Sequence, residues 1–117
     1  METKAVVLSS LLTSPANIML SVCALCPTFD CVNTLLHGIE GRLVQADIPF
    51  RRYGSLLLTC GNTITCMAST ITDVERYAGF VPESGLIVFI DSDRLNKEAV
   101  RIVMDLYSQL HPVVEVK

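Results

Sequence analysis

The chain has 117 residues, of which 50% are apolar and 18% charged, and its formal net charge is −3. Disordered chains combine low hydrophobicity with high net charge, and proteins that bind nucleic acid by counterion release carry a basic excess. This composition therefore excludes both classes, and the length predicts a single globular domain over residues 1–117.

The N-terminal part of the chain is apolar and almost uncharged. Residues 4–12 are β-branched near their start and have no polar helical face, which predicts a buried strand. Ser14 and Pro15 are typical of a helix N-cap and a first helical position. Residues 15–26 are therefore predicted to form a helix that ends before Pro27.

The alternative for this segment is a targeting or membrane-associated sequence over residues 5–29, which contain no charged side chain. A spanning helix needs about 20 predominantly apolar residues. Pro15 and Asn17 interrupt the apolar run, so we prefer the buried strand and helix and expect no membrane partner.

A second helix is predicted to begin after Thr28, whose hydroxyl suits an N-cap. Apolar residues recur behind it at three- and four-residue spacing and form one face: Phe29, Val32, Leu35, Leu36 and Ile39. Gly38 and Gly41 predict the end of this helix.

A short strand is predicted over residues 43–48, and Pro49 then breaks the chain. The basic-aromatic cluster that follows, Arg51, Arg52 and Tyr53, is predicted to be an exposed loop. Arginine and tyrosine are common interface anchors, so these side chains are candidates for contacts with a partner.

Residues 55–69 predict a β-hairpin, because two apolar segments flank Gly61-Asn62-Thr63. A three-residue loop pairs Cys60 with Ile64 and separates the side chains into two faces. One face is apolar: Leu56, Leu58, Cys60, Ile64, Cys66 and Ala68. The second face is mixed and is predicted to meet a partner: Leu57, Thr59, Thr63, Thr65 and Met67.

The C-terminal part predicts a right-handed βαβ unit over residues 86–116. Residues 86–90 form a continuous apolar run, which is typical of a central strand, and residues 95–110 and 113–116 predict a helix and a last strand. A Thr-x-x-Glu capping box at residues 72–75 precedes them. The fold class is therefore α/β or α+β, with helices packed on a mixed sheet of about five strands.

Asp91 and Asp93 follow the predicted central strand directly. Ligands of open α/β sheets bind beyond the carboxyl ends of the strands, and paired carboxylates there can hold Mg²⁺. Aspartate after a strand is also an ordinary helix cap, which is the interpretation we prefer. A small Mg-dependent phosphoryl-transfer or hydrolase domain is the alternative, and no cofactor is predicted.

Five cysteines are too few, and odd in number, for a disulfide scaffold. Cys23 and Cys26 have the spacing of a zinc half-site, but Cys60 and Cys66 do not form a matching second half. We therefore predict no metal site, and free cysteines favour a reducing compartment, the cytoplasm or the nucleus.

A domain of this size buries roughly 60% of the surface of its unfolded chain, so a half-apolar chain needs a further cover. We expect a non-enzymatic protein-interaction module, either an obligate dimer or a small subunit or adaptor of a larger complex. Its partner is another protein chain rather than nucleic acid. The candidate contact residues are Leu57, Thr59, Thr65, Met67, Arg51, Arg52 and Tyr53.

Overall fold

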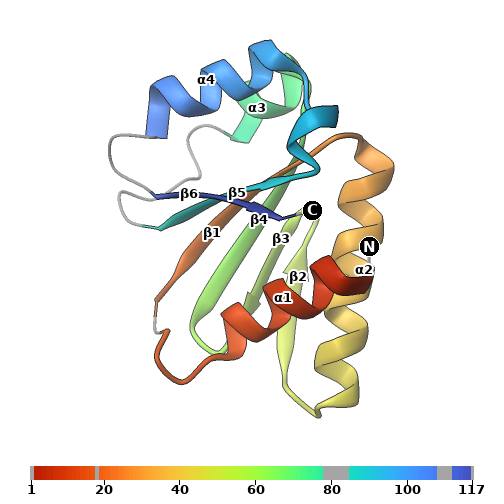
Figure 1. Cartoon of the computed structure of the whole chain (residues 1–117). Coiled ribbons are helices and arrows are strands. Elements are labelled where there is room, and N and C mark those ends of the chain that lie inside the picture. Colours follow the sequence, from red (N-terminus) through yellow and green to blue (C-terminus); the bar gives the residue numbers. More distant parts are fainter. Residues whose placement is uncertain (1, 18, 78–84, 108–111, 117) are drawn as a thin grey trace.

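A six-stranded mixed sheet forms the centre of the computed structural model, which describes residues 2–17, 19–77, 85–107 and 112–116 (Figure 1). In chain order the elements are α1 (Glu2–Thr13), β1 (Ser21–Cys26), α2 (Phe29–Gln45), β2 (Phe50–Tyr53), β3 (Leu56–Thr59), β4 (Asn62–Ala68), α3 (Ile71–Tyr77), β5 (Leu86–Ile90), the 3-10 turn η2 (Ser92–Arg94), α4 (Lys97–Tyr107) and β6 (Val113–Val116). The α/β class and the mixed sheet are as predicted.

The strand order is β2-β3-β4-β1-β5-β6. The four strands from β4 to β6 run parallel, and β2 and β3 extend the sheet as an antiparallel meander beside β4. β1 therefore lies at the centre, with β4 on one side and β5 on the other. The predicted central strand at residues 86–90, the last strand at 113–116 and their parallel connection through a helix are confirmed.

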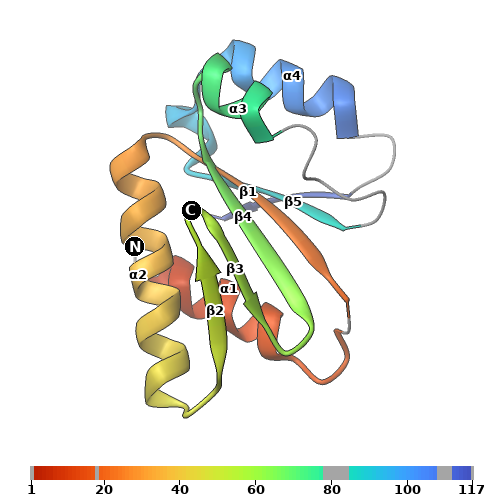
Figure 2. The ribbon, with the colours of Figure 1, turned by 180° about the vertical axis from the view of Figure 1, so that it is seen from behind.

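Helices cover both faces of the sheet (Figures 1 and 2). One core cluster joins α1 and α2 to the sheet, and the other joins α3 and α4 to the opposite face. Gly38 is the point of close approach between α1 and α2, because a β-carbon built there lies 2.7 Å from the β-carbon of Ala5.

The prediction for the N-terminal segment is wrong, because its helix and strand occur in the reverse order. α1 takes the place of the predicted strand, and its buried residues Ala5, Leu8 and Leu12 recur at helical spacing. β1 occupies the end of the predicted helix and is buried on both faces. Neither segment carries a continuous polar face that contrasts with an apolar one, so their periodicity does not distinguish a buried helix from a central strand.

None of the helices in the described residues is long and apolar enough to cross a membrane. Pro15 lies in the connection between α1 and β1 rather than in a helix, within a turn in which the Asn17 amide donates to the Ser14 carbonyl.

The second helix begins as predicted but ends later. The Thr28 hydroxyl accepts a hydrogen bond from the Cys31 amide at 3.2 Å, as an N-cap does. α2 then continues through Gly38 and Gly41 to Gln45, so the strand predicted over residues 43–48 is wrong. The burial of Leu43 in the α1–α2 core favours the helix over the local glycine signal.

The hairpin is confirmed, but its predicted register is wrong. Thr59 pairs with Asn62 and Leu58 with Thr63, so the turn has two residues, Cys60 and Gly61. Both have positive φ, 53° and 77°, as a type I′ turn requires. This shift of one residue places Leu57 on the same face as Ile64 instead of the opposite face.

Two further boundaries differ from the prediction. The capping residue of α3 is Thr70, two positions before Thr72 of the predicted capping box, because the Thr70 hydroxyl accepts the Asp73 amide at 3.1 Å. Asn96 caps α4 by accepting the amides of Glu98 and Ala99. The end of the helix predicted over residues 95–110 lies outside the described residues.

Candidate functional site

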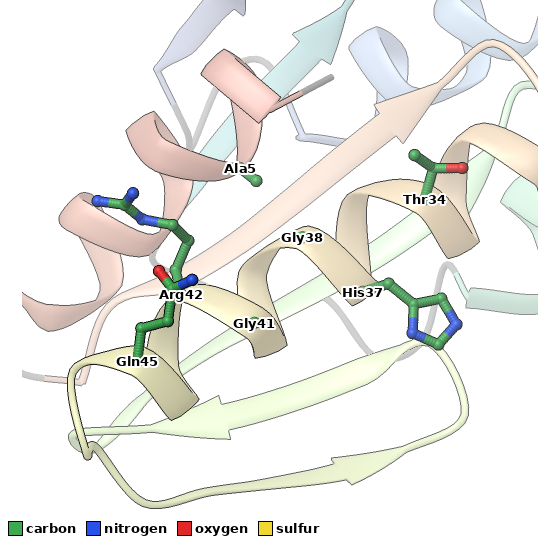
Figure 3. A pocket seen from close by; sticks show the side chains of 7 residues that line it. All are labelled: Ala5, Thr34, His37, Gly38, Gly41, Arg42 and Gln45. Atoms are coloured by element: carbon green, nitrogen blue, oxygen red, sulfur yellow. The ribbon is translucent and has the colours of Figure 1, made fainter.

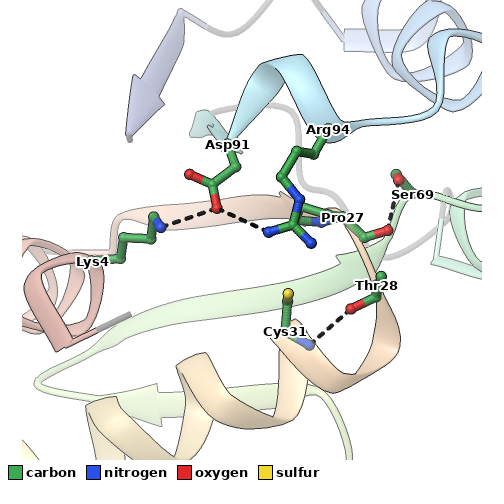
Figure 4. Close-up of polar contacts among 7 residues, drawn as sticks. All are labelled: Lys4, Pro27, Thr28, Cys31, Ser69, Asp91 and Arg94. Carbon is green, nitrogen blue, oxygen red and sulfur yellow. Dashed lines mark hydrogen bonds and ion pairs between the residues drawn. The ribbon is translucent and has the colours of Figure 1, made fainter.

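The carboxyl ends of β1 and β5 form the topological switch point of the parallel strands, because the chain continues from β1 to β4 on one side and later to β5 on the other. Asp91 follows β5 there in a left-handed conformation, with φ 49°. Lys4 of α1 donates to the Asp91 carboxylate at 3.0 Å, and the Arg94 guanidinium lies 3.8 Å from it (Figure 4). Two cations therefore neutralise the one carboxylate at this position.

The polar groups around the switch point bind one another. The Ser69 hydroxyl, at the end of β4, donates to the Pro27 carbonyl at 3.0 Å and accepts the Asn96 amide at 3.2 Å (Figure 4 shows the first of these bonds). This buried serine ties the ends of β4 and β1 to the start of α4. No buried side-chain nitrogen or oxygen of the described residues lacks a hydrogen-bond partner.

Asp91 and Asp93 do not come together as a paired-carboxylate site. Asp93 is exposed on η2, while Asp91 is half-buried against Lys4. Within the described ranges, no three His, Cys, Asp or Glu side chains gather closely enough to hold a metal ion. A magnesium ion at Asp91 competes with an existing ion pair, so the structure gives the alternative enzymatic hypothesis no specific support.

Cys23 and Cys26 point to opposite faces of β1, because Cys23 belongs to the α3–α4 core and Cys26 to the α1–α2 core. They therefore do not form a zinc half-site. Burial raises the pKa of the Cys23 thiol to about 12, with a smaller contribution from Cys26. A hydrogen bond with Cys26, followed by burial, raises the pKa of Cys66 well above its usual value. These thiols are protonated core residues at neutral pH.

A hollow of about 320 Å³ lies between α1 and the outer side of α2 (Figure 3). Ala5 lines it from α1, and the remaining lining residues come from α2: Thr34, His37, Gly38, Gly41, Arg42 and Gln45. Arg42 and Gln45 lie together at one end and His37 at the other. His37 is exposed and sits 3.8 Å from Glu40, so it has the surroundings of a surface residue.

The predicted contact residues do not form one surface. Leu57, Thr59, Thr65 and Met67 are all buried within this chain. Leu57 and Thr59 face the α1–α2 side of the sheet. Thr65 and Met67 alternate with Ile64 and Cys66 along β4 and therefore face the opposite side, toward α3 and α4. The prediction that these four side chains share an open face is therefore wrong, as a consequence of the register shift.

The basic-aromatic cluster is an edge strand rather than a loop. Arg51 and Tyr53 are exposed on β2. Arg52 forms an ion pair with Glu40 of α2 and donates to the Gly54 carbonyl at 2.9 Å. The two charged arginine side chains thus disfavour pairing of this edge with another strand.

The opposite edge has a different character. β6 contains three valines and one glutamate, and among the described residues it pairs with β5 alone. A groove of about 430 Å³ runs between this edge and α1. No charged side chain lines it: Val7, Leu8, Ser10, Leu11, Ser14, Asn17, Leu86, Val88, Val114 and Val116. We call the edge of β6 together with this groove the α1–β6 surface.

The α1–β6 surface is the part that sequence reasoning missed. Val7 is 45% and Val114 43% exposed, although both are apolar. The residues 113–116 were correctly predicted as a strand, but their place at the edge depends on the strand order. Compared with known proteins, the chain matches no protein-family model and no curated protein.

Proposed function

We propose that the chain is a non-enzymatic protein-interaction module, an obligate dimer or a small subunit or adaptor of a larger complex, and that the α1–β6 surface is where another chain binds. The observation that carries the proposal is a strand edge of mostly apolar composition beside an uncharged groove. Such an edge is a template for pairing with a further strand, and exposed apolar patches mark interaction sites.

The contrast between the two sheet edges supports this choice of surface. β2 carries Arg51 and Arg52, which disfavour pairing, whereas β6 presents Val113 and Val114 to solvent. A partner strand on β6 uses its free main-chain groups, and the groove beside it takes apolar side chains of the partner. The five free cysteines support a reducing compartment, the cytoplasm or the nucleus.

Affinity capture from the native source tests the proposal, with the wild-type chain, Val114→Lys and Tyr53→Lys as baits. Val114 lies on the α1–β6 surface and is 43% exposed, and Tyr53, on the opposite edge of the sheet, is 61% exposed. We expect a bound protein, another copy of the chain included, that is retained by Tyr53→Lys and lost by Val114→Lys. Identical capture by all three baits, or loss with Tyr53→Lys alone, contradicts the proposed surface.

A further inference from the structure

The hydrogen bonds between β5 and β6 show which main-chain groups of β6 have no partner among the residues that the structure describes. In the parallel ladder with β5, the Ile87 amide donates to Pro112 and the Asp91 amide donates to Val116, both at 3.0 Å. Alternate residues of a strand turn their main-chain groups to the same neighbour, so residues 112, 114 and 116 face β5. The amides and carbonyls of Val113 and Glu115 therefore point away from the sheet.

We infer that this edge binds the same edge of a second copy of the chain, with β6 and its copy antiparallel about a two-fold axis at Val114. The inference rests on the proposed function and names its partner. Val113 of each copy then exchanges hydrogen bonds with Glu115 of the other, and the two Val114 residues form the intervening non-hydrogen-bonded pair.

The alternation of free groups and the charge of Glu115 select this register. A symmetric pairing centred between two residues joins an outward-facing residue to an inward-facing one and forms no ladder. A pairing centred on Glu115 places two carboxylates directly opposite each other, which is unfavourable. Centring on Val113 leaves Glu115 opposite position 111, which lies outside β6. Centring on Val114 avoids these arrangements and pairs the outward-facing Val113 and Glu115 of both copies.

The second copy also covers the groove. A two-fold axis perpendicular to the sheet keeps both α1 helices on the same face of the continuous sheet, one on each side of the join. The side chains of Val114 and Val116 lie on this face, where Val7 of α1 is also exposed. A short strand pair alone is small against the roughly 800 Å² per partner of a stable interface, and the two α1 faces with their grooves add the apolar area.

Two lysine substitutions at adjacent exposed valines test the register. Val114→Lys opposes two ammonium groups across the axis, whereas Val113→Lys places each new lysine opposite Glu115 of the other copy. By light scattering and sedimentation, we expect wild-type dimers, a dissociation constant raised about tenfold or more by Val114→Lys, and one unchanged or lowered by Val113→Lys. Circular dichroism checks that each variant folds.

Cysteine cross-linking gives a second readout that does not depend on charge. A non-hydrogen-bonded antiparallel pair has α-carbons about 4.5 Å apart, which a disulfide can bridge. In a background that lacks the accessible thiols, Cys31→Ser with Cys60→Asn, we expect Val114→Cys to form a disulfide-linked dimer in oxidised glutathione. Val113→Cys, which faces Glu115 of the copy, forms none.

The outcomes separate the two proposals. A wild-type chain that stays monomeric at all concentrations overturns the second copy as partner, and equal cross-linking of both cysteine variants overturns the Val114-centred register. If capture in the native source still depends on Val114, the α1–β6 surface keeps its proposed function with a different chain. If neither dimerisation nor capture responds to Val114→Lys, both proposals fail.

Discussion

Asn62 shows how a single buried polar side chain joins the N-terminal segment to the sheet. It is 1% exposed, and its side-chain amide donates to the carbonyls of Leu12 and Asn17 while its oxygen accepts the Leu20 amide at 2.8 Å. These bonds hold the end of α1, the following turn and the start of β1 against β4. In the sequence Asn62 has only the character of a turn residue, because its partners lie more than 40 residues away.

We predict that Asn62→Ala lowers the free energy of unfolding by about 3 kcal/mol, because it removes three bonds and leaves buried main-chain groups without partners. Urea denaturation followed by circular dichroism measures the change. Asn33→Ala, on the half-buried part of α2, is the matched control and is expected to change stability little. A loss for Asn62→Ala no larger than that of Asn33→Ala contradicts the role assigned to this side chain.

The buried thiols predict how stability depends on pH. The pKa of Cys23 is about 12 in the folded chain and 9.0 in the absence of burial, so the unfolded chain loses this proton first as the pH rises. The stabilisation is thus complete below pH 9 and is lost progressively toward pH 12. We expect Cys23→Ala to reduce the alkaline decline of the unfolding free energy, and the same decline in both proteins contradicts this account.

At the scale of elements, the two glycines of α2 are a matched pair. A β-carbon at Gly38 meets Ala5 of α1 at 2.7 Å, whereas one at Gly41 meets nothing within 4 Å. Gly41→Ala should stabilise the chain by up to about 1 kcal/mol through helix propensity, and Gly38→Ala should destabilise it by about 1–3 kcal/mol through overpacking. Thermal unfolding of the two variants measures the difference, and equal stabilisation by both rules out the close α1–α2 contact.

In the hairpin turn, one substitution is predicted to raise the stability of the chain. Cys60 adopts a positive φ of 53°, which is unfavourable for most side chains but accessible to asparagine. Cys60→Asn creates the Asn-Gly pair that type I′ turns prefer, so we expect a gain of about 0.5–1 kcal/mol. Denaturant midpoints of the wild type and Cys60→Asn test this, with a decrease in the midpoint as the contrary result.

The elements that the sequence predicted correctly are those with a local physical signal. Thr28 caps α2 as expected, and residues 86–90 form a central strand because they are apolar without interruption. The exchange of α1 and β1 was not predictable from periodicity, since β1 is buried on both faces and α1 exposes the apolar Val7 as well as the polar Ser10. The register of the hairpin depends on the left-handed backbone conformation of Cys60, which a cysteine in the sequence does not predict.

In the candidate site too, features with a local sequence signal were predictable and features set by long-range packing were not. The position of Asp91 at the end of a central strand was predictable, but its partner Lys4 comes from a helix that the sequence placed as a strand. The α1–β6 surface depends on strand order and on α1, which are set by long-range packing. Local patterns therefore located the strand at residues 113–116 without showing that, among the described strands, it pairs with β5 alone.

At the scale of the whole molecule, the apolar excess is largely accounted for by two cores on the two faces of one sheet. The apolar side chains that remain exposed occur on several elements, but the two edges of the sheet differ from each other. The β2 edge carries two arginines, and the β6 edge is rich in valine and lies beside an uncharged groove. This asymmetry is the physical basis for assigning the interaction to one edge of the sheet.

Amide hydrogen exchange at Val113 and Glu115 tests the central claim most directly, because these amides have no partner within the sheet but face the proposed second strand. With rising protein concentration, we predict that both become protected toward the level of the Ile87 amide, which is bonded to Pro112. Val114→Lys should abolish that protection. Exchange of Val113 and Glu115 at unprotected rates at every concentration would contradict pairing of this edge with a second copy.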